Sequence, residues 1–157
     1  MPLPRITSEE AKLSQLTLDL ADCVSAADLS IQHVFSSHLI LAGAGHVENS
    51  IIQVLSEYGR INGNLVIKRY VEKSVSRNNS LNCEKIANIC NQFDTTWWSH
   101  LEGVTLQAER DAVDSLKTLR DQVAHGRRNG TGYSVVKGYV HNAKSFVQKF
   151  SVVVLGH

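Results

Sequence analysis

The residues of this sequence that are best suited to phosphate chemistry lie close together near position 120. Arg120 is followed five positions later by His125, with Asp121 next to the arginine and Gly126 directly behind the histidine. An imidazole, with an ordinary pKa of about 6.5, takes or gives a proton near neutral pH, and a guanidinium offers a rigid fork of donors to phosphate oxygens. These side chains suit cleavage of RNA by its own 2′-hydroxyl, a reaction that requires no metal ion.

The spacing decides what one copy of this motif can do on a helix. Residues five apart lie about 140° apart around an α-helix and about 7.5 Å along it, so Arg120 and His125 are not stacked neighbours. Asp121 and His125 are four apart and share a face, so the carboxylate could orient the imidazole. RNA cleavage needs a base for the 2′-hydroxyl and an acid for the leaving 5′-oxygen. One copy looks incomplete, because a single histidine would have to fill both roles.

A plainer interpretation of the same residues has to be weighed. His125 could satisfy carbonyl groups at the end of its own helix. Arg120 could form an ion pair with one of three nearby carboxylates, those of Asp114, Asp121 or Glu109. On the motif alone we favour this structural interpretation, because an arginine and a histidine at this spacing occur by chance in many helical proteins. The surrounding sequence reverses that preference.

The motif and its context resemble the RiboL-PSP-HEPN branch of the HEPN superfamily, whose signature is R-x4-6-H. In this branch the motif typically reads R-N-x-x-A-H-G at the end of a long helix. Arg120, Ala124, His125 and Gly126 match it, and Asp121 stands where asparagine is common but aspartate is accepted. We therefore favour a functional site, with Arg120 and His125 as the catalytic residues.

The likeness extends upstream of the motif. The runs at 37–48, 70–73 and 84–98 also resemble the branch, so the resemblance covers roughly residues 30 to 150, and the first 25 or so residues carry none of it. Glu48 lines up with an acidic residue that is often present on the early long helix of the family. Glu48 and Asp121 are therefore expected to support the site.

The resemblance implies both a fold and an activity. The fold is all-α, an antiparallel HEPN-like bundle of about five to seven helices. It forms a single domain over residues 1–157, with residues 1–25 as an N-terminal extension or extra helix. The activity is that of a metal-independent endoribonuclease, similar to toxins and phage-defence effectors, with an RNA substrate and an antitoxin or regulatory protein as a further partner. HEPN proteins generally pair so that two motifs face each other, which implies a homodimer with a shared active site.

Two other hypotheses remain open. The chain could be a non-catalytic HEPN module that binds RNA, a nucleotide or a protein partner, or a purely structural helical dimer. The net charge of +1 gives no overall electrostatic attraction for nucleic acid, so any such contact must be local. Arg127 and Arg128 directly follow the motif and are the candidates for binding RNA.

Composition sets further limits. A chain of 157 residues with 43% hydrophobic and 20% charged residues fits one folded domain, and only 2 prolines favour helix. The 3 cysteines lack C-x-x-C spacing, which indicates free thiols in a reducing cytosol. No apolar run approaches the length of a membrane span, so a cytoplasmic protein is expected. The spacing of the remaining histidines predicts no metal site, and no cofactor is expected.

Apolar periodicity and capping residues predict the helices. Caps are expected at 7–8 and at Asp28, Asn64, Asn82 and Asp94. The expected helices cover 8–24, 28–60, 65–76, 83–92, a turn with Trp97 and Trp98, 104–125, and 133–153.

Two features inside these segments invite a functional interpretation that we do not favour. The run 42–45 reads Ala-Gly-Ala-Gly, but it lacks the strand, the third glycine and the lysine of a phosphate-binding loop. It is expected to let a neighbouring helix approach closely, or to mark a kink. Trp97 and Trp98 could stack RNA bases, but at least one is expected to pack in the core.

Overall fold

The computed structural model describes residues 3–25, 28–128 and 130–156, and all regular structure within these ranges is helical. The seven helices are α1 (Pro4–Ser25), α2 (Leu29–Asn62), α3 (Leu65–Val75), α4 (Cys83–Phe93), α5 (Trp97–Val104), α6 (Gln107–Ala124) and α7 (Tyr133–Leu155). The expected all-α bundle is confirmed.

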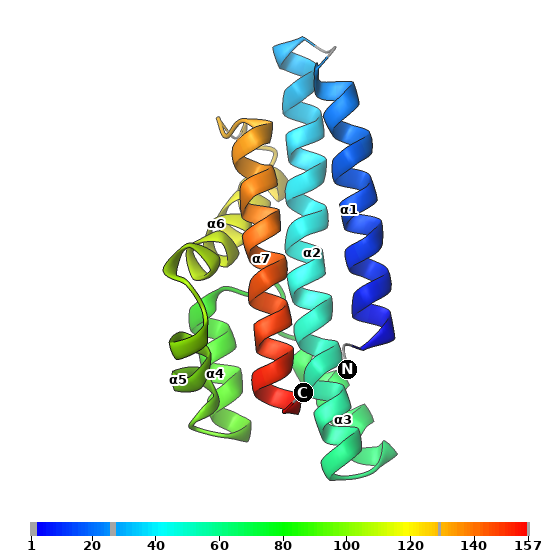
Figure 1. The fold of residues 1–157 in the computed structure, drawn as a ribbon, viewed down its shortest axis with the longest axis vertical. Helices are drawn as coiled ribbons and strands as arrows, with labels where there is room; N and C mark the ends of the chain where they lie inside the picture. The colour runs from blue at the N-terminus through cyan, green and yellow to red at the C-terminus, as the bar shows by residue number, and fades with distance from the viewer. Residues whose placement is uncertain (1–2, 26–27, 129, 157) are drawn as a thin grey trace.

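The long helix α2 is the centre of the bundle (Figure 1). It packs against α1, α3, α6 and α7, while α7 also packs against α5 and α6. The helices α1 and α2 form an antiparallel pair, and α7 lies on the other side of α2 (Figure 1). The first helix is thus an integral layer of the bundle, in contact with both α2 and α7.

The capping predictions are partly right. Asn64 accepts hydrogen bonds from the N–H groups of Val66 and Ile67, and Asn82 accepts one from that of Lys85. Asp94 accepts the N–H of Thr96 at 2.8 Å in the turn before α5, as expected. The starts of α1 and α2 differ from the expectation. Asp28 precedes α2 without a capping hydrogen bond from its side chain. The first helix begins at Pro4 rather than near residue 8, because proline has its φ already set for the first helical position.

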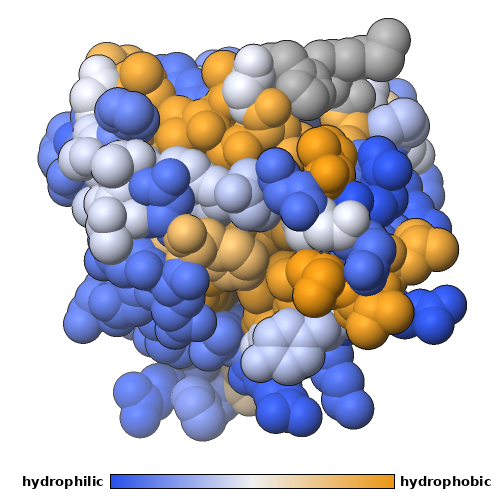
Figure 2. All heavy atoms as spheres, turned by 90° about the horizontal axis from the view of Figure 1, so that it is seen from below, coloured by the Kyte–Doolittle hydropathy of each residue, from blue (hydrophilic) through white to orange (hydrophobic). Residues whose placement is uncertain are grey.

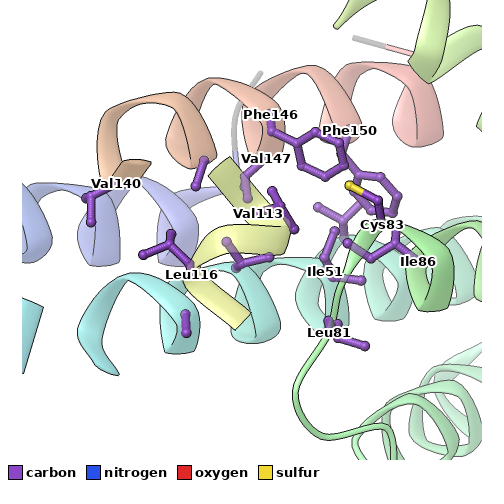
Figure 3. Packing of buried hydrophobic residues seen from close by; sticks show 14 of the residues in the cluster. Ile51, Leu81, Cys83, Ile86, Val113, Leu116, Val140, Phe146, Val147 and Phe150 are labelled. Atoms are coloured by element: carbon purple, nitrogen blue, oxygen red, sulfur yellow. The ribbon is translucent and has the colours of Figure 1, made fainter. Parts of the chain in front are cut away.

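The core forms where α2, α6 and α7 meet the start of α4 (Figure 3). Phe146 and Phe150 of α7 are almost fully buried there, beside Cys83 and Ile86 of α4. From α6, Ala112, Leu116 and Leu119 form an apolar stripe, and all three are buried. Burial of this stripe fixes which face of α6 remains available for chemistry.

Glu109 corrects one detail of that stripe. Its spacing predicts a solvent-facing carboxylate, but it is 4% exposed. Lys149 of α7 lies 2.8 Å from both carboxylate oxygens, the Ser145 hydroxyl donates to one, and the Leu106 N–H donates to the other at 2.8 Å. Burial raises the pKa of Glu109, but these hydrogen bonds outweigh it and leave the pKa below its ordinary value. Glu109 is therefore engaged by α7 and is not the partner of Arg120.

Trp97 lies in the core, as expected for at least one of the tryptophans. Its ring meets Tyr58 edge-on, with centroids 4.8 Å apart, and stacks on Phe93 at 5.9 Å. Trp98 is partly buried and packs against the same core. Trp97 therefore closes the base of the bundle and offers no free face for an RNA base.

The lower end of the molecule exposes a group of apolar side chains (Figure 2). They come from the last turn of α2 and from α3, namely Ile61, Leu65, Val66, Ile67 and Tyr70. We call these residues the α3 patch. Apolar side chains grouped on a surface are typical of contact sites with other molecules.

No helix within the described ranges is long and apolar enough to cross a membrane. Among these residues no group of three histidine, cysteine or acidic side chains is placed to hold a metal ion. His46 is buried, and burial, followed by the charge of Lys144, lowers its pKa to about 4, so its imidazole is neutral at physiological pH. The cysteines Cys23, Cys83 and Cys90 are free thiols.

Gly43 marks the closest approach between α2 and its neighbours, in agreement with the expected role of the glycines. A Cβ atom placed there would lie 2.8 Å from Cγ2 of Val140 and 3.4 Å from the methyl groups of Leu116. Val140 belongs to α7 and Leu116 to α6, so one missing side chain lets both helices pack against α2. At Gly45, a Cβ atom would meet nothing within 4 Å.

This contrast predicts opposite effects of the same substitution two residues apart. Gly45→Ala should raise the free energy of unfolding by up to about 1 kcal/mol, because alanine is the better helix former. Gly43→Ala has the same gain, but overpacking against Val140 should offset it by about 1–3 kcal/mol. Urea unfolding followed by circular dichroism would measure both, and equal stability of the two variants would contradict the close contact at Gly43.

Candidate active site

The motif lies at the C-terminal end of α6, and the chain ends this helix as the sequence predicts. The helix stops at Ala124, His125 is its C-cap, and Gly126 has a left-handed φ of 66°. This conformation lets the N–H of Gly126 donate to Val123 O at 3.0 Å and that of Arg127 to Gln122 O at 2.9 Å. Most side chains at position 126 would be strained, so glycine is the residue best suited to this sharp ending.

The imidazole of His125 is exposed at this helix end. Arg127 and Arg128 follow it and are exposed as well. Within the part of the chain that is described, none of these three side chains makes a hydrogen bond or an ion pair. They are therefore available to an anionic ligand, or to a second copy of the chain.

Asp121 is the most heavily bonded residue of the motif. Lys117 Nζ lies 2.7 Å from Oδ2, the Ser80 hydroxyl donates to Oδ1 at 2.7 Å, and Arg120 Nη1 lies 3.6 Å from Oδ1. Lys117, then Ser80, and more weakly Arg120 lower the pKa of Asp121 to about 2. The carboxylate is therefore ionised throughout the physiological range.

These contacts differ from the arrangement that the spacing suggested. Both oxygens of Asp121 face Ser80 and Lys117, and among the described residues the imidazole of His125 receives no hydrogen bond from it. The plainer interpretation of Arg120 is partly seen, since this residue pairs with Asp121. Asp114 serves a different purpose, because it accepts the N–H of Cys83 at the start of α4 at 2.7 Å.

Glu48 joins the site from α2. Its carboxylate is partly buried and accepts a hydrogen bond from the backbone N–H of Ser80. The same Ser80 donates its hydroxyl to Asp121. The two acidic residues proposed as supporting groups, far apart in sequence, are thus brought together by one serine in the loop between α3 and α4.

Sequence reasoning did not identify Ser80. Its segment, Asn-Asn-Ser, indicates only a loop, and nothing in it announces contact with the motif. In the structure Ser80 has φ 60°, the one positive φ outside glycine among the described residues. Such a conformation costs a serine roughly 1–2 kcal/mol. A residue that keeps such a conformation despite its cost often belongs to a functional site, and this conformation is visible in the structure but not in the sequence.

A hollow of about 390 Å³ lies between α6 and α7, close to the motif in sequence. It is lined by Asp111, Asp114, Ser115, Thr118, Leu119, Thr131 and Tyr139. The two carboxylates make this hollow unfavourable for a phosphate group. An anionic ligand is better served by the helix end that carries His125, Arg127 and Arg128.

Comparison with known proteins identifies the family of the chain. The sequence model of the RiboL-PSP-HEPN family matches residues 5–155, a longer stretch than the 30 to 150 expected, and it includes α1. Neither the curated proteins nor the solved structures give a match. Since the match covers nearly the whole chain and contains the complete motif, the chain belongs to the RiboL-PSP-HEPN family.

Proposed function

We propose that the protein is a metal-independent endoribonuclease that cleaves RNA by attack of a ribose 2′-hydroxyl on the adjacent phosphate. The observation that carries this proposal is the end of α6. There an exposed imidazole, His125, lies five residues from a guanidinium, Arg120, that pairs with an ionised carboxylate.

Each residue has a chemical role in this proposal. His125 moves protons, taking one from the 2′-hydroxyl or giving one to the leaving 5′-oxygen. Arg120 stabilises the charge that develops on the phosphate oxygens, while its Nη1 lies 3.6 Å from Oδ1 of Asp121. Asp121 and Glu48 hold this arrangement rather than reacting with RNA.

Because the proposed reaction uses no metal ion, the protein should cleave RNA in the presence of EDTA. Products should carry a 2′,3′-cyclic phosphate or 3′-phosphate and a 5′-hydroxyl, because the 2′-oxygen is the nucleophile. His125→Ala removes proton transfer and should slow cleavage by about 10²–10⁴-fold while RNA still binds. Products with a 5′-phosphate, or cleavage of a substrate that lacks the scissile 2′-hydroxyl, would exclude this mechanism.

A homodimer completes the proposed site. With two motifs face to face, one His125 acts as base and the other as acid, and the interface includes the segment 120–125. The exposure of His125 in the single chain is compatible with a partner at this surface.

The dimer makes activity depend on protein concentration. Specific activity should fall when the protein is diluted below its dimer dissociation constant, as measured by sedimentation over the same concentration range. A chain that sediments as a monomer and still cleaves RNA at full rate would contradict a shared site.

Arg127 and Arg128 are proposed to bind RNA phosphates beside the cleaved position. In a His125→Ala background, replacing both arginines with glutamine should weaken RNA binding most at low salt. If both contact phosphates, the slope of log K against log salt concentration should become shallower by roughly 1.4 for single-stranded RNA. An unchanged slope would place the RNA elsewhere. As a control, Lys12→Gln removes one positive charge on α1, outside the motif, and should leave the slope unchanged.

A second candidate function is a module that binds a protein partner without cleaving RNA. The α3 patch favours it, because its apolar side chains are exposed in the single chain. The two functions are compatible if the partner regulates the nuclease, as an antitoxin would. A regulated nuclease of this kind would act as a toxin or a phage-defence effector in the cytoplasm. Binding of a partner by a protein that cleaves no RNA would favour the module alone.

A further inference from the structure

The loop between α3 and α4 is fixed from several sides. Leu81 is 3% exposed and points into the core together with Ile51 and Ile86 (Figure 3). The N–H of Cys83 is held by Asp114 of α6 at 2.7 Å. Lys85 Nζ donates to the backbone oxygens of Asn79 and Ser80, at 3.1 and 3.2 Å. Ser80 itself therefore has little freedom to move relative to α6.

At this fixed point Ser80 makes two different contacts. Its N–H donates to Glu48 on α2, and its hydroxyl donates to Oδ1 of Asp121 on α6. The positive φ of 60° turns the backbone N–H and the side chain toward these two carboxylates. Since serine is disfavoured in this conformation, the contacts must compensate for it.

The contact with Asp121 bears directly on Arg120. Oδ1 of Asp121 accepts from the Ser80 hydroxyl at 2.7 Å and faces Nη1 of Arg120 at 3.6 Å. Lys117 holds the other oxygen, Oδ2, at 2.7 Å. A carboxylate held at both oxygens has one orientation, and so it presents a fixed acceptor to the guanidinium.

We propose that Ser80 is a positioning residue of the nuclease: its hydroxyl locks Asp121 so that Arg120 is held in the orientation that receives the scissile phosphate. This inference rests on the proposed function and deepens it. Ser80 touches no reacting atom, and its effect reaches the reaction through Asp121 and Arg120. Because the binding charges stay in place when the hydroxyl is lost, the rate of cleavage should suffer more than the affinity for RNA.

Ser80→Gly is the sharpest variant, because it removes the hydroxyl while glycine adopts a positive φ without strain. The variant should remain folded, with its unfolding midpoint close to that of the wild type, because relief of the strain at positive φ offsets part of the lost hydrogen bond. Its kcat should fall by about 10- to 100-fold while KM changes by less than about 2-fold, the loss expected for one hydrogen bond to a charged group. Ser80→Asn should recover part of kcat, because asparagine tolerates positive φ and its amide can donate to Asp121.

The matched control is Asn79→Gly. It places the same flexible residue one position earlier in the loop, at an exposed side chain, and keeps the Ser80 hydroxyl. Its kcat and KM should equal those of the wild type. A loss of kcat in Asn79→Gly as large as that in Ser80→Gly would show that loop flexibility matters rather than the hydroxyl, and would overturn the proposal.

Two further measurements separate positioning from mere structural support. In an Asp121→Ala background, which has no acceptor for the Ser80 hydroxyl, Ser80→Gly should cost little more activity, because both substitutions break the same link, so the two effects should be strongly non-additive. The pKa of Asp121, followed by carboxyl-carbon NMR, should rise from about 2 in the wild type when the Ser80 hydrogen bond is removed. Additive losses, or an unchanged pKa, would overturn the inference.

The outcomes distinguish this inference from the proposed function. If the wild type cleaves RNA and Ser80→Gly cleaves it at the same kcat, the inference alone fails and the nuclease stands. If the wild type cleaves no RNA at any dimer concentration, the nuclease fails and the positioning role falls with it. A folded Ser80→Gly that binds RNA normally, cuts it slowly and is partly rescued by asparagine supports both.

Discussion

The close packing of α2 against α6 and α7 determines where every group of the motif lies. At Gly43, Val140 and Leu116 approach so near that a Cβ atom would touch Val140 at 2.8 Å. Leu116 is also part of the buried stripe of α6, so this contact sets the rotation of α6 about its own axis. Because that stripe faces the core, Asp121 lies on another face of α6, where Ser80 of the loop before α4 contacts it.

One face of α6 also holds the start of α4 and the loop that precedes it. Asp114, Lys117 and Asp121 follow one another at spacings of three and four residues, so they lie along a single line on the helix surface. Asp114 holds the start of α4 through the Cys83 N–H, and Asp121 holds the preceding loop through Ser80. The helix that carries the motif thus also fixes the loop that positions it, which links the stability of the fold to the geometry of the site.

Features set by residues close in sequence could be predicted, whereas contacts between residues on different helices could not. The helix ends at Asn64, Asn82 and Gly126 depend on residues a few positions away, and these could be predicted. Glu109 was placed on the wrong side, because its partner Lys149 comes from another helix and periodicity alone assigns a carboxylate to solvent. Ser80 was missed for the same physical reason: its partners lie on α2 and α6, and no local pattern encodes a contact between them.

The distribution of charge at the end of α6 bears on how two copies would meet. The acids Asp121 and Glu48 are engaged within the chain, whereas His125, Arg127 and Arg128 are exposed. The surface is thus locally positive although the net charge of the chain is only +1. In the proposed face-to-face dimer two such surfaces approach each other and repel, unless an anion lies between them. A phosphate backbone supplies that anion. Binding of RNA and pairing of the two motifs would then favour each other, since a ligand that binds only the dimer stabilises it.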